Sequence, residues 1–217
     1  MADPFHFSSS TSLTLVTNRR ARDLAELLGH LREVSGAVIY HHTHNFLVQH
    51  QYLSPEPAND FAHWVGAVLQ EDRLGEQLAA IDMIQFRSLT VLRERIVAMI
   101  EAYLEQRREL RTAPPGEEFY FGESVTFVTP TGQTANDLAE FADCMEHIGF
   151  GSLSFHFFDA RLRLERGEND FSEWLRALGE DALAAAIARL DPYTHTMDSL
   201  RGEVVRLVRR RLAEARR

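Results

Sequence analysis

The sequence has no lysine and a single cysteine, Cys144, among its 217 residues. One cysteine excludes an internal disulfide and a thiolate zinc site within the chain. The sequence also lacks an uncharged apolar run of about 18 residues, the length that a membrane-spanning helix needs. Its first residues, MADPFHF, have neither the basic flank nor the apolar segment of a signal peptide. We therefore expect a soluble protein of the cytoplasm.

Known catalytic signatures are missing as well. The sequence has no GxxxxGKS or GxxxxGKT, no GxSxG, no HExxH and no CxxC pattern, and no GxGxxG follows an expected strand. These patterns place phosphates, nucleophiles or metal ions, so their absence removes the usual routes to an enzyme class. The sequence therefore neither assigns nor excludes an enzymatic activity.

Acidic residues outnumber basic residues, 32 to 23. The formal net charge of -9 argues against binding to nucleic acids or anionic membranes, because both are polyanions. One local exception is the C-terminal end, where seven arginines fall within the last 17 residues. We interpret this stretch as an exposed helix face, with a phosphate- or nucleic-acid-binding helix as the alternative.

Two segments of the chain resemble each other. Phe5–Ser35 aligns with Phe119–Gly149 without gaps at an offset of 114 positions, and nine of the 31 pairs are identical. One inserted residue then shifts the offset to 115, which pairs His41 with His156. Further along, the motif Asn-Asp-Phe-x-x-Trp occurs at residues 59–64 and 169–174. Unrelated segments share roughly one residue in fifteen, so the sequence predicts a tandem duplication.

The joint between the two copies is marked by helix-breaking residues. Pro114, Pro115 and Gly116 follow one another and cannot continue a helix. We predict a first repeat over residues 1–110, a linker over 111–118 and a second repeat over 119–217, as two repeats or one fused globular domain.

Each copy is expected to be mostly helical. Alternating phenylalanines, Phe5 and Phe7 in the first copy, predict a short strand or extended arm at its start. Thr17 and Thr131 are the expected N-caps of the next helices, and Ser88 that of a later one. The predicted class is mainly α: a duplicated helical unit with a short strand or arm at the start of each copy, packed as a pseudo-twofold pair.

Several short segments carry a resemblance to a known family. They are IYHHTH at 39–44, SPEPANDF at 54–61, FHFF at 155–158 and NDF at 169–171. Together they resemble a bacterial family catalogued only as a domain of unknown function, and the resemblance covers most of the chain. It implies no activity, cofactor or catalytic residue.

Histidine is the residue type that points to chemistry, because seven of the ten histidines lie in the first 63 positions. At the offset of 115, His41 and His44 correspond to His156 and Asp159, so each central helix carries two ligand-type side chains on one face. Helices that meet across a pseudo-twofold axis would combine these four side chains into a site for Zn, Fe or Mn. The alternative is that the histidines pack in the core, with His42 at the surface.

Other repeated residues have structural interpretations. The Asn-Asp pairs at 59–60 and 169–170 are typical helix caps. The acidic pair Asp23 and Glu26, which recurs in the second copy, is typical of a first helical turn. Both tryptophans are expected to anchor the core.

The favoured function is a soluble interaction or regulatory module that binds a protein partner or a second copy of itself. The alternative is a metal-binding protein or metal-dependent enzyme with its His and Asp ligands at the interface of the repeats. A third hypothesis is a small-ligand sensor with an aromatic pocket.

Overall fold

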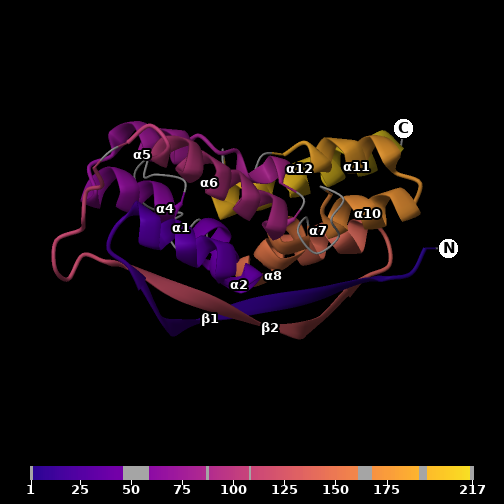
Figure 1. The fold of residues 1–217 in the computed structure, drawn as a ribbon. Helices are drawn as coiled ribbons and strands as arrows, with labels where there is room; N and C mark the ends of the chain where they lie inside the picture. The colour runs from indigo at the N-terminus through magenta and orange to yellow at the C-terminus, as the bar shows by residue number, and fades with distance from the viewer. Residues whose placement is uncertain are drawn as a thin grey trace. The chain divides into compact units, whose positions relative to one another are not determined.

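The computed structural model describes residues 2–45, 59–86, 88–107, 109–160, 168–190 and 195–215. Its first element, β1 (Phe5–Ala21), pairs with β2 (Phe119–Ala135) in a two-stranded antiparallel sheet. Figure 1 shows the two strands crossing as a long ribbon, β1 in indigo and β2 in salmon. No described helix is long and apolar enough to cross a membrane.

The predicted fold class is wrong. Each strand has 17 residues, so the protein mixes α and β structure and is not a mainly α chain with short arms. The tandem duplication packed as a pseudo-twofold pair is not shown either. Thr17 lies within β1, where its hydroxyl donates a hydrogen bond to the carbonyl of Phe121, and Thr131 lies within β2. Neither threonine caps a helix.

The chain forms two compact units, and the strands run through both. The continuous unit is Ser12–Val125, and the discontinuous unit combines Met1–Thr11 with Thr126–Arg217. Each strand is therefore divided between the units, and each unit contains the start of one strand and the end of the other. The predicted repeats are 1–110 and 119–217. Residues 1–11 of the first repeat lie in the unit formed mainly by the second, and residues 119–125 of the second repeat lie in the unit formed mainly by the first.

In the continuous unit the helices begin at side-chain caps. Asp23 accepts hydrogen bonds from two backbone N–H groups of the first turn, at 2.9 Å each. Asn59 caps the helix before Trp64 as predicted, and Ser88 caps the last helix as predicted. The elements are α1 (Leu24–Glu33), α2 (Gly36–Tyr40), the π-helical turns η1 (His41–Asn45) and η2 (Trp64–Val68), α4 (Asp60–His63), α5 (Asp72–Ala79), the short 3-10 turn η3 (Met83–Gln85) and α6 (Leu89–Leu104).

The discontinuous unit has a comparable order of elements after its strand. Asp137 and Asn169 cap two of its helices. The elements are α7 (Leu138–His147), α8 (Phe150–Ser154), the π-helical turn η4 (Phe155–Asp159), α10 (Asp170–Ala177), α11 (Asp181–Ala188) and α12 (Met197–Ala215).

The exchanged strand ends fill the core of each unit. Phe5 and Phe7 from β1 pack on Phe141 of α7, at ring distances of 5.7 and 5.8 Å. Burying a phenylalanine contributes about 2 kcal/mol, so each strand end is a substantial part of the core it enters. Both tryptophans are buried core residues, as predicted, and the indole of Trp174 also donates to the carbonyl of Asp3.

Candidate functional site

In the continuous unit, the buried side chain of His42 is hydrogen-bonded to β2. The Nδ1 atom of His42 lies 2.7 Å from a carboxylate oxygen of Asp60, and Nε2 accepts a hydrogen bond from the backbone N–H of Gly122 at 2.9 Å. Because Nε2 accepts, the ring proton is on Nδ1 and is donated to the carboxylate. The side chain of His42 therefore links α4 to β2.

The discontinuous unit contains a site of the same construction. Nδ1 of His156 lies 2.7 Å from a carboxylate oxygen of Asp170, and Nε2 accepts from the backbone N–H of Ser8 at 2.8 Å. Both histidines are buried, and both lie in π-helical turns, at His41–Asn45 and Phe155–Asp159. A π turn widens the helix and redirects its side chains, which suits a ring that must reach a strand.

The close approach of strand and helix also depends on glycine. A Cβ atom on Gly122 would lie 2.7 Å from the ring of His41, closer than real contacts of this kind. A Cβ on Gly151 would lie 2.6 Å from the hydroxyl of Ser9. Both units therefore use a residue without a side chain where the backbone of the strand meets the helix.

These contacts correct the sequence alignment. His156 shares its environment with His42 rather than His41, and the bounds of α2 and α8 keep the offset of 114. The inserted residue was an error, and His42 is buried rather than a surface residue. The sequence held the signal: without the insertion, His42 and His156 align, as do Asp60 and Asp170 within their motif.

Each histidine occupies one edge of the ribbon in its own unit: His42 the edge of β2, and His156 the edge of β1. The side-chain hydroxyls of three threonines donate to carbonyl groups of the opposite strand: Thr17 to Phe121, Thr131 to Phe7 and Thr129 to Ser9. Val16 lies eight residues after Ser8 on β1, and Pro130 lies eight residues after Gly122 on β2. Along a strand, successive residues direct their N–H and C=O groups to alternate edges, so residues an even number of positions apart face the same edge. Since the N–H groups of Gly122 and Ser8 point out to the histidines, positions 16 and 130 also point outward, each at the edge of its unit that the histidine does not occupy.

The other edge is open in the continuous unit. Leu13, Leu15 and Val16 are 55%, 52% and 81% exposed, and Thr14 is exposed as well. Successive side chains of a strand point to opposite faces, so both faces are uncovered here. We call this segment, Leu13–Val16, the β1 edge. It pairs only with β2 in the described part of the chain.

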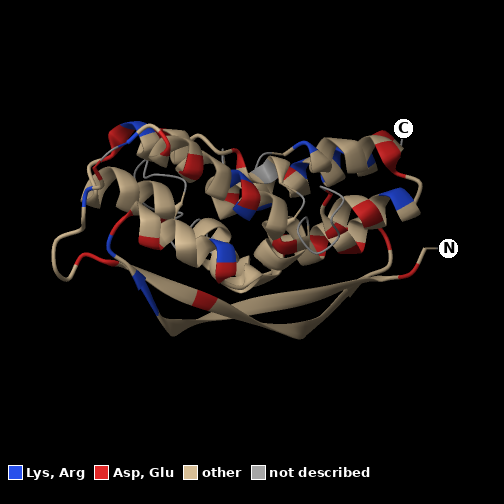
Figure 2. Cartoon of the chain, in the orientation of Figure 1, with Lys and Arg blue, Asp and Glu red and all other residues tan. Residues whose placement is uncertain are grey.

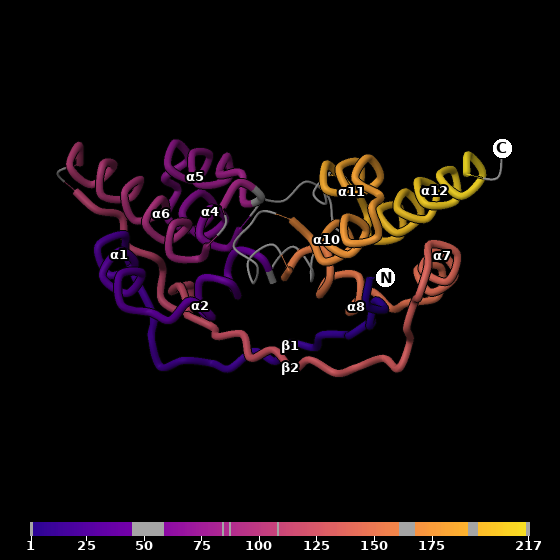
Figure 3. Tube along the Cα trace, turned by 90° about the vertical axis from the view of Figure 1, so that its right-hand side faces the viewer, coloured from indigo at the N-terminus to yellow at the C-terminus, as the bar shows by residue number. Residues whose placement is uncertain are grey.

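The β1 edge itself carries no charged residue. No Asp, Glu, Lys or Arg lies between Phe7 and Asn18. Figure 2 shows most of the ribbon in tan, with a blue stretch towards one end and a red stretch along it. In Figure 3 the described helices of the continuous unit all lie on one side of its half of the ribbon. Natural proteins usually protect such edges with charges, prolines or a covering element. An uncharged, apolar, uncovered edge is therefore a candidate interaction surface.

The matching edge of the discontinuous unit carries a protecting residue. Pro130 stands 114 positions after Val16, at the place where an outward N–H would be, and proline has no N–H to donate. Gly132 follows with a φ of 78°, a left-handed conformation that interrupts a regular strand. Phe127 and Val128 are exposed nearby. The β2 edge thus has exposed apolar side chains but a blocked backbone.

The predicted metal ligands have other contacts within their own units. His44 stacks on Tyr40, its Nδ1 lies 2.8 Å from the hydroxyl of Thr43, and burial lowers its pKa to about 4. Burial, with the neighbouring His42, also lowers the pKa of His41. Asp159 accepts a weak hydrogen bond from Ser10 at 3.4 Å.

His156 uses Nε2 to accept the N–H of Ser8, so metal binding at this atom would require that bond to break. Among the described residues, no group of three or more His, Cys, Asp or Glu side chains is arranged to hold a metal ion. His41 and His44 lie in one unit and His156 and Asp159 in the other. The four-ligand site therefore stays a prediction.

The arginine-rich C-terminal helix is extensively paired. Each described arginine of α12 lies within 4.0 Å of a carboxylate, either on the same helix or on a neighbouring element. The pairs are Arg201 with Asp198, Arg206 with Glu203, Arg209 with Asp143 and Glu146, Arg210 with Glu214, and Arg211 with Glu180. Anion binding along this helix would compete with these carboxylates. Arg216 and Arg217 lie outside the described residues.

Comparison with known proteins places the chain in a family and finds a solved structure with a similar fold. The chain belongs to a family of unknown function, DUF5752, whose sequence profile matches residues 2–209. It is similar to a solved structure, OrfY from Thermoproteus tenax, with 36% sequence identity and a TM-score of 0.81. That similarity covers 96% of this chain and 95% of the other. No curated protein matches the sequence.

Proposed function

We propose that the protein is an interaction module that associates through the β1 edge, with a second copy of the chain as its partner. The observation that carries this proposal is the combination found at Leu13–Val16: exposed apolar side chains on both faces, an unpaired edge in the described sheet, and no charge within the segment. An added strand would form main-chain hydrogen bonds with that edge and cover the apolar side chains.

A second copy is the partner that this chemistry favours. Two identical edges can pair antiparallel about a twofold axis, and each residue then meets a partner from the same short segment. Because the segment has no charges, self-pairing brings no like charges together. Leucine, valine and threonine are also the residue types that pack well across neighbouring strands.

The contrast between Val16 and Pro130 supports the choice of edge. The two residues occupy corresponding places on the outer edges of the two units, yet only Val16 has an N–H to offer. Strand addition at β2 would lose a hydrogen bond at Pro130. The chain is therefore expected to associate at one edge rather than two, which gives a closed dimer instead of a fibre.

The test introduces into the β1 edge the residue that Pro130 provides in the β2 edge. Val16→Pro removes the outward N–H without removing an N–H that bonds to β2, so the unit should still fold. Val128→Pro is the matched control, because Val128 is an exposed valine on the outer edge of the other strand. Sedimentation velocity should find the wild type and Val128→Pro as dimers and Val16→Pro as a monomer.

A monomeric wild type at every concentration would overturn the proposal, as would a dimer that survives Val16→Pro. Should Val16→Pro fail to fold by circular dichroism, Leu15→Lys provides the same test, since a charge placed at the edge repels its own copy. A dimer that persists in folded Leu15→Lys would then reject the β1 edge.

The metal hypothesis is the competing proposal for this protein. It predicts that His41, His44, His156 and Asp159 bind Zn, Fe or Mn. Elemental analysis of protein purified without an affinity tag tests it directly, with His41→Ala as the comparison. A stoichiometric metal that is lost in His41→Ala would favour this alternative, whereas a metal-free dimer would favour the β1 edge.

A further inference from the structure

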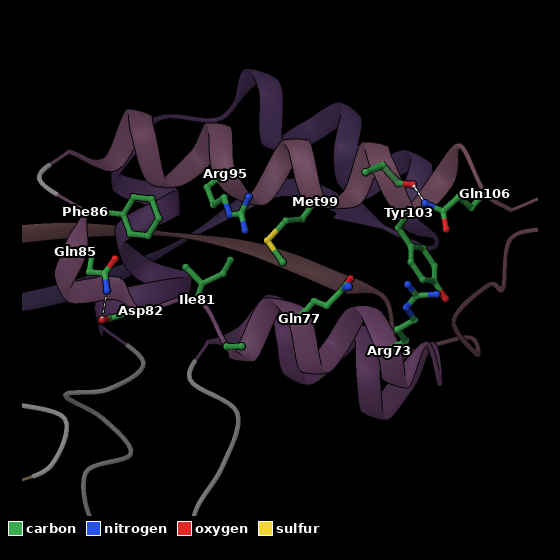
Figure 4. Close-up of a pocket in the computed structure, with 12 residues that line it drawn as sticks. Arg73, Gln77, Ile81, Asp82, Gln85, Phe86, Arg95, Met99, Tyr103 and Gln106 are labelled. Carbon is green, nitrogen blue, oxygen red and sulfur yellow. Dashed lines mark hydrogen bonds between the residues drawn. The ribbon is translucent and has the colours of Figure 1, made fainter.

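A groove of about 570 Å³ lies in the continuous unit between α5 and α6. Its floor includes the apolar side chains of Ile81 and Met99, and Figure 4 shows the ring of Phe86 near one end and that of Tyr103 at the other. This volume falls within the range of about 300–1,000 Å³ that is usual for sites of small molecules. An apolar floor between two rings suits a compact organic group.

Two arginines give the groove its charge. Arg95 projects from α6 and Arg73 from α5, so each helix contributes one guanidinium group (Figure 4). Among the described residues of the lining, the one carboxylate is that of Asp82, which accepts a hydrogen bond from Gln85 at 2.9 Å. The lining therefore has an excess of positive charge, although the whole chain is acidic.

Arg73 and Arg95 differ from most arginines of this protein because they form no ion pair with any residue that the structure describes. Most described arginines form ion pairs, including all those of α12. Within the described part of the chain, the arginines that form none are Arg73, Arg93, Arg95 and Arg189. Two of these four line the same groove. Guanidinium groups without a carboxylate partner keep all their donors available for a ligand anion.

A network at the end of the groove fixes the helices that carry the arginines. The hydroxyl of Tyr103 donates to the buried carboxylate of Glu71, which also accepts from Arg107 at 3.0 Å. Glu71 is the residue before α5, and Tyr103 lies in α6, so this network joins the two walls. The spacing between the helices is thereby held without the help of a ligand.

From these features we infer that the groove binds a small organic anion, a phosphate monoester or a carboxylate with an apolar body. The anionic group lies against Arg95, and the apolar body lies on Ile81 and Met99 beside it (Figure 4). Arg73 lies at the other end of the groove, next to Tyr103, and adds to its positive charge. This binding site is separate from the β1 edge, and none of its residues belongs to that surface.

Isothermal titration calorimetry with phenyl phosphate and phenylacetate tests the inference. At least one of the two should bind more tightly than inorganic phosphate, because only the organic anions can cover the apolar floor. The two probes distinguish a phosphate from a carboxylate group. Affinity should fall as salt is raised, since the arginines are exposed.

Substitutions locate the site. Arg95→Gln should weaken binding of the better probe about tenfold, the effect of one charge-assisted hydrogen bond. Arg73→Gln should weaken it less, because Arg73 lies at the other end of the groove. Arg189→Gln is the matched control, since it removes the same charge from an arginine outside the groove that also has no ion pair. It should leave the affinity unchanged.

Three results would overturn the inference. They are no detectable binding of either organic probe, equal affinity for inorganic phosphate, and equal weakening by Arg95→Gln and Arg189→Gln. Circular dichroism of each variant shows whether a loss of binding results from unfolding. A variant that does not fold is replaced by Met99→Glu, which places a negative charge on the floor and should abolish binding.

Discussion

Replacing His42 tests how much the histidine link contributes to the continuous unit. In His42→Ala the N–H of Gly122 loses its partner in a buried position, which costs about 1–3 kcal/mol. The ring also packs between Phe61 and Phe119, at centroid distances of 5.4 and 4.7 Å, and its removal leaves a cavity worth about 1–2 kcal/mol. The Asp60 side chain is 31% exposed, so its carboxylate regains water and adds little.

The expected loss in the free energy of unfolding is therefore about 2–5 kcal/mol. The units have one tryptophan each, so the fluorescence of Trp64 in a Trp174→Phe background reports the continuous unit alone. Urea unfolding followed in this way gives the midpoint and slope for His42→Ala. His63→Ala, an exposed histidine on α4, is the control and should change stability by less than about 0.5 kcal/mol.

A loss below about 1 kcal/mol in His42→Ala would refute the reasoning, because a buried N–H left without a partner costs at least that much. Equal losses in His42→Ala and His63→Ala would refute it as well. They would mean that the strand is held by its apolar side chains alone.

Further predictions concern the core, the pH dependence and the strand contact. Trp64→Ala and Trp174→Ala should each lower the stability of their own unit by about 3–5 kcal/mol in urea unfolding, and unchanged midpoints would contradict their burial. Burial lowers the pKa of His44 to about 4, so the unfolded chain binds more protons below pH 6.5. Stability should therefore fall as pH drops from about 6.5 towards 4, and His44→Gln should flatten that slope. Gly122→Ala should cost about 1–3 kcal/mol because of its 2.7 Å clash with the ring of His41, whereas Gly149→Ala, with no atom within 4 Å, should be neutral or stabilising.

The sequence predicted those features that depend on local chemistry. The caps at Asn59 and Ser88 follow from side chains that bond to nearby backbone N–H groups, and both are confirmed. The burial of both tryptophans follows from their size and apolar character. Such features need only a few neighbouring residues to be read correctly.

Features that depend on distant partners were missed. The Ser- and Thr-rich stretch after Phe7 has no strong apolar alternation, so its strand character comes from pairing with β2, more than 100 residues away. The roles of Asp60 and Asp170 were missed for a similar reason, since each was explained by its helix end and not by a histidine 18 or 14 residues earlier. The misplaced insertion then concealed the match between His42 and His156.

The exchange of strand ends sets an order for folding during synthesis. The continuous unit is complete once Val125 has been made, whereas the discontinuous unit needs residues from both ends of the chain. Phe5 and Phe7 leave the ribosome first, but their core partners on α7 and α10 are translated much later. At about 5–20 residues per second, these rings wait for several seconds or more without a core. The polar serines and threonines that follow them help to keep the nascent strand soluble during that interval. The discontinuous unit is therefore complete only when the last helix, α12, has been made.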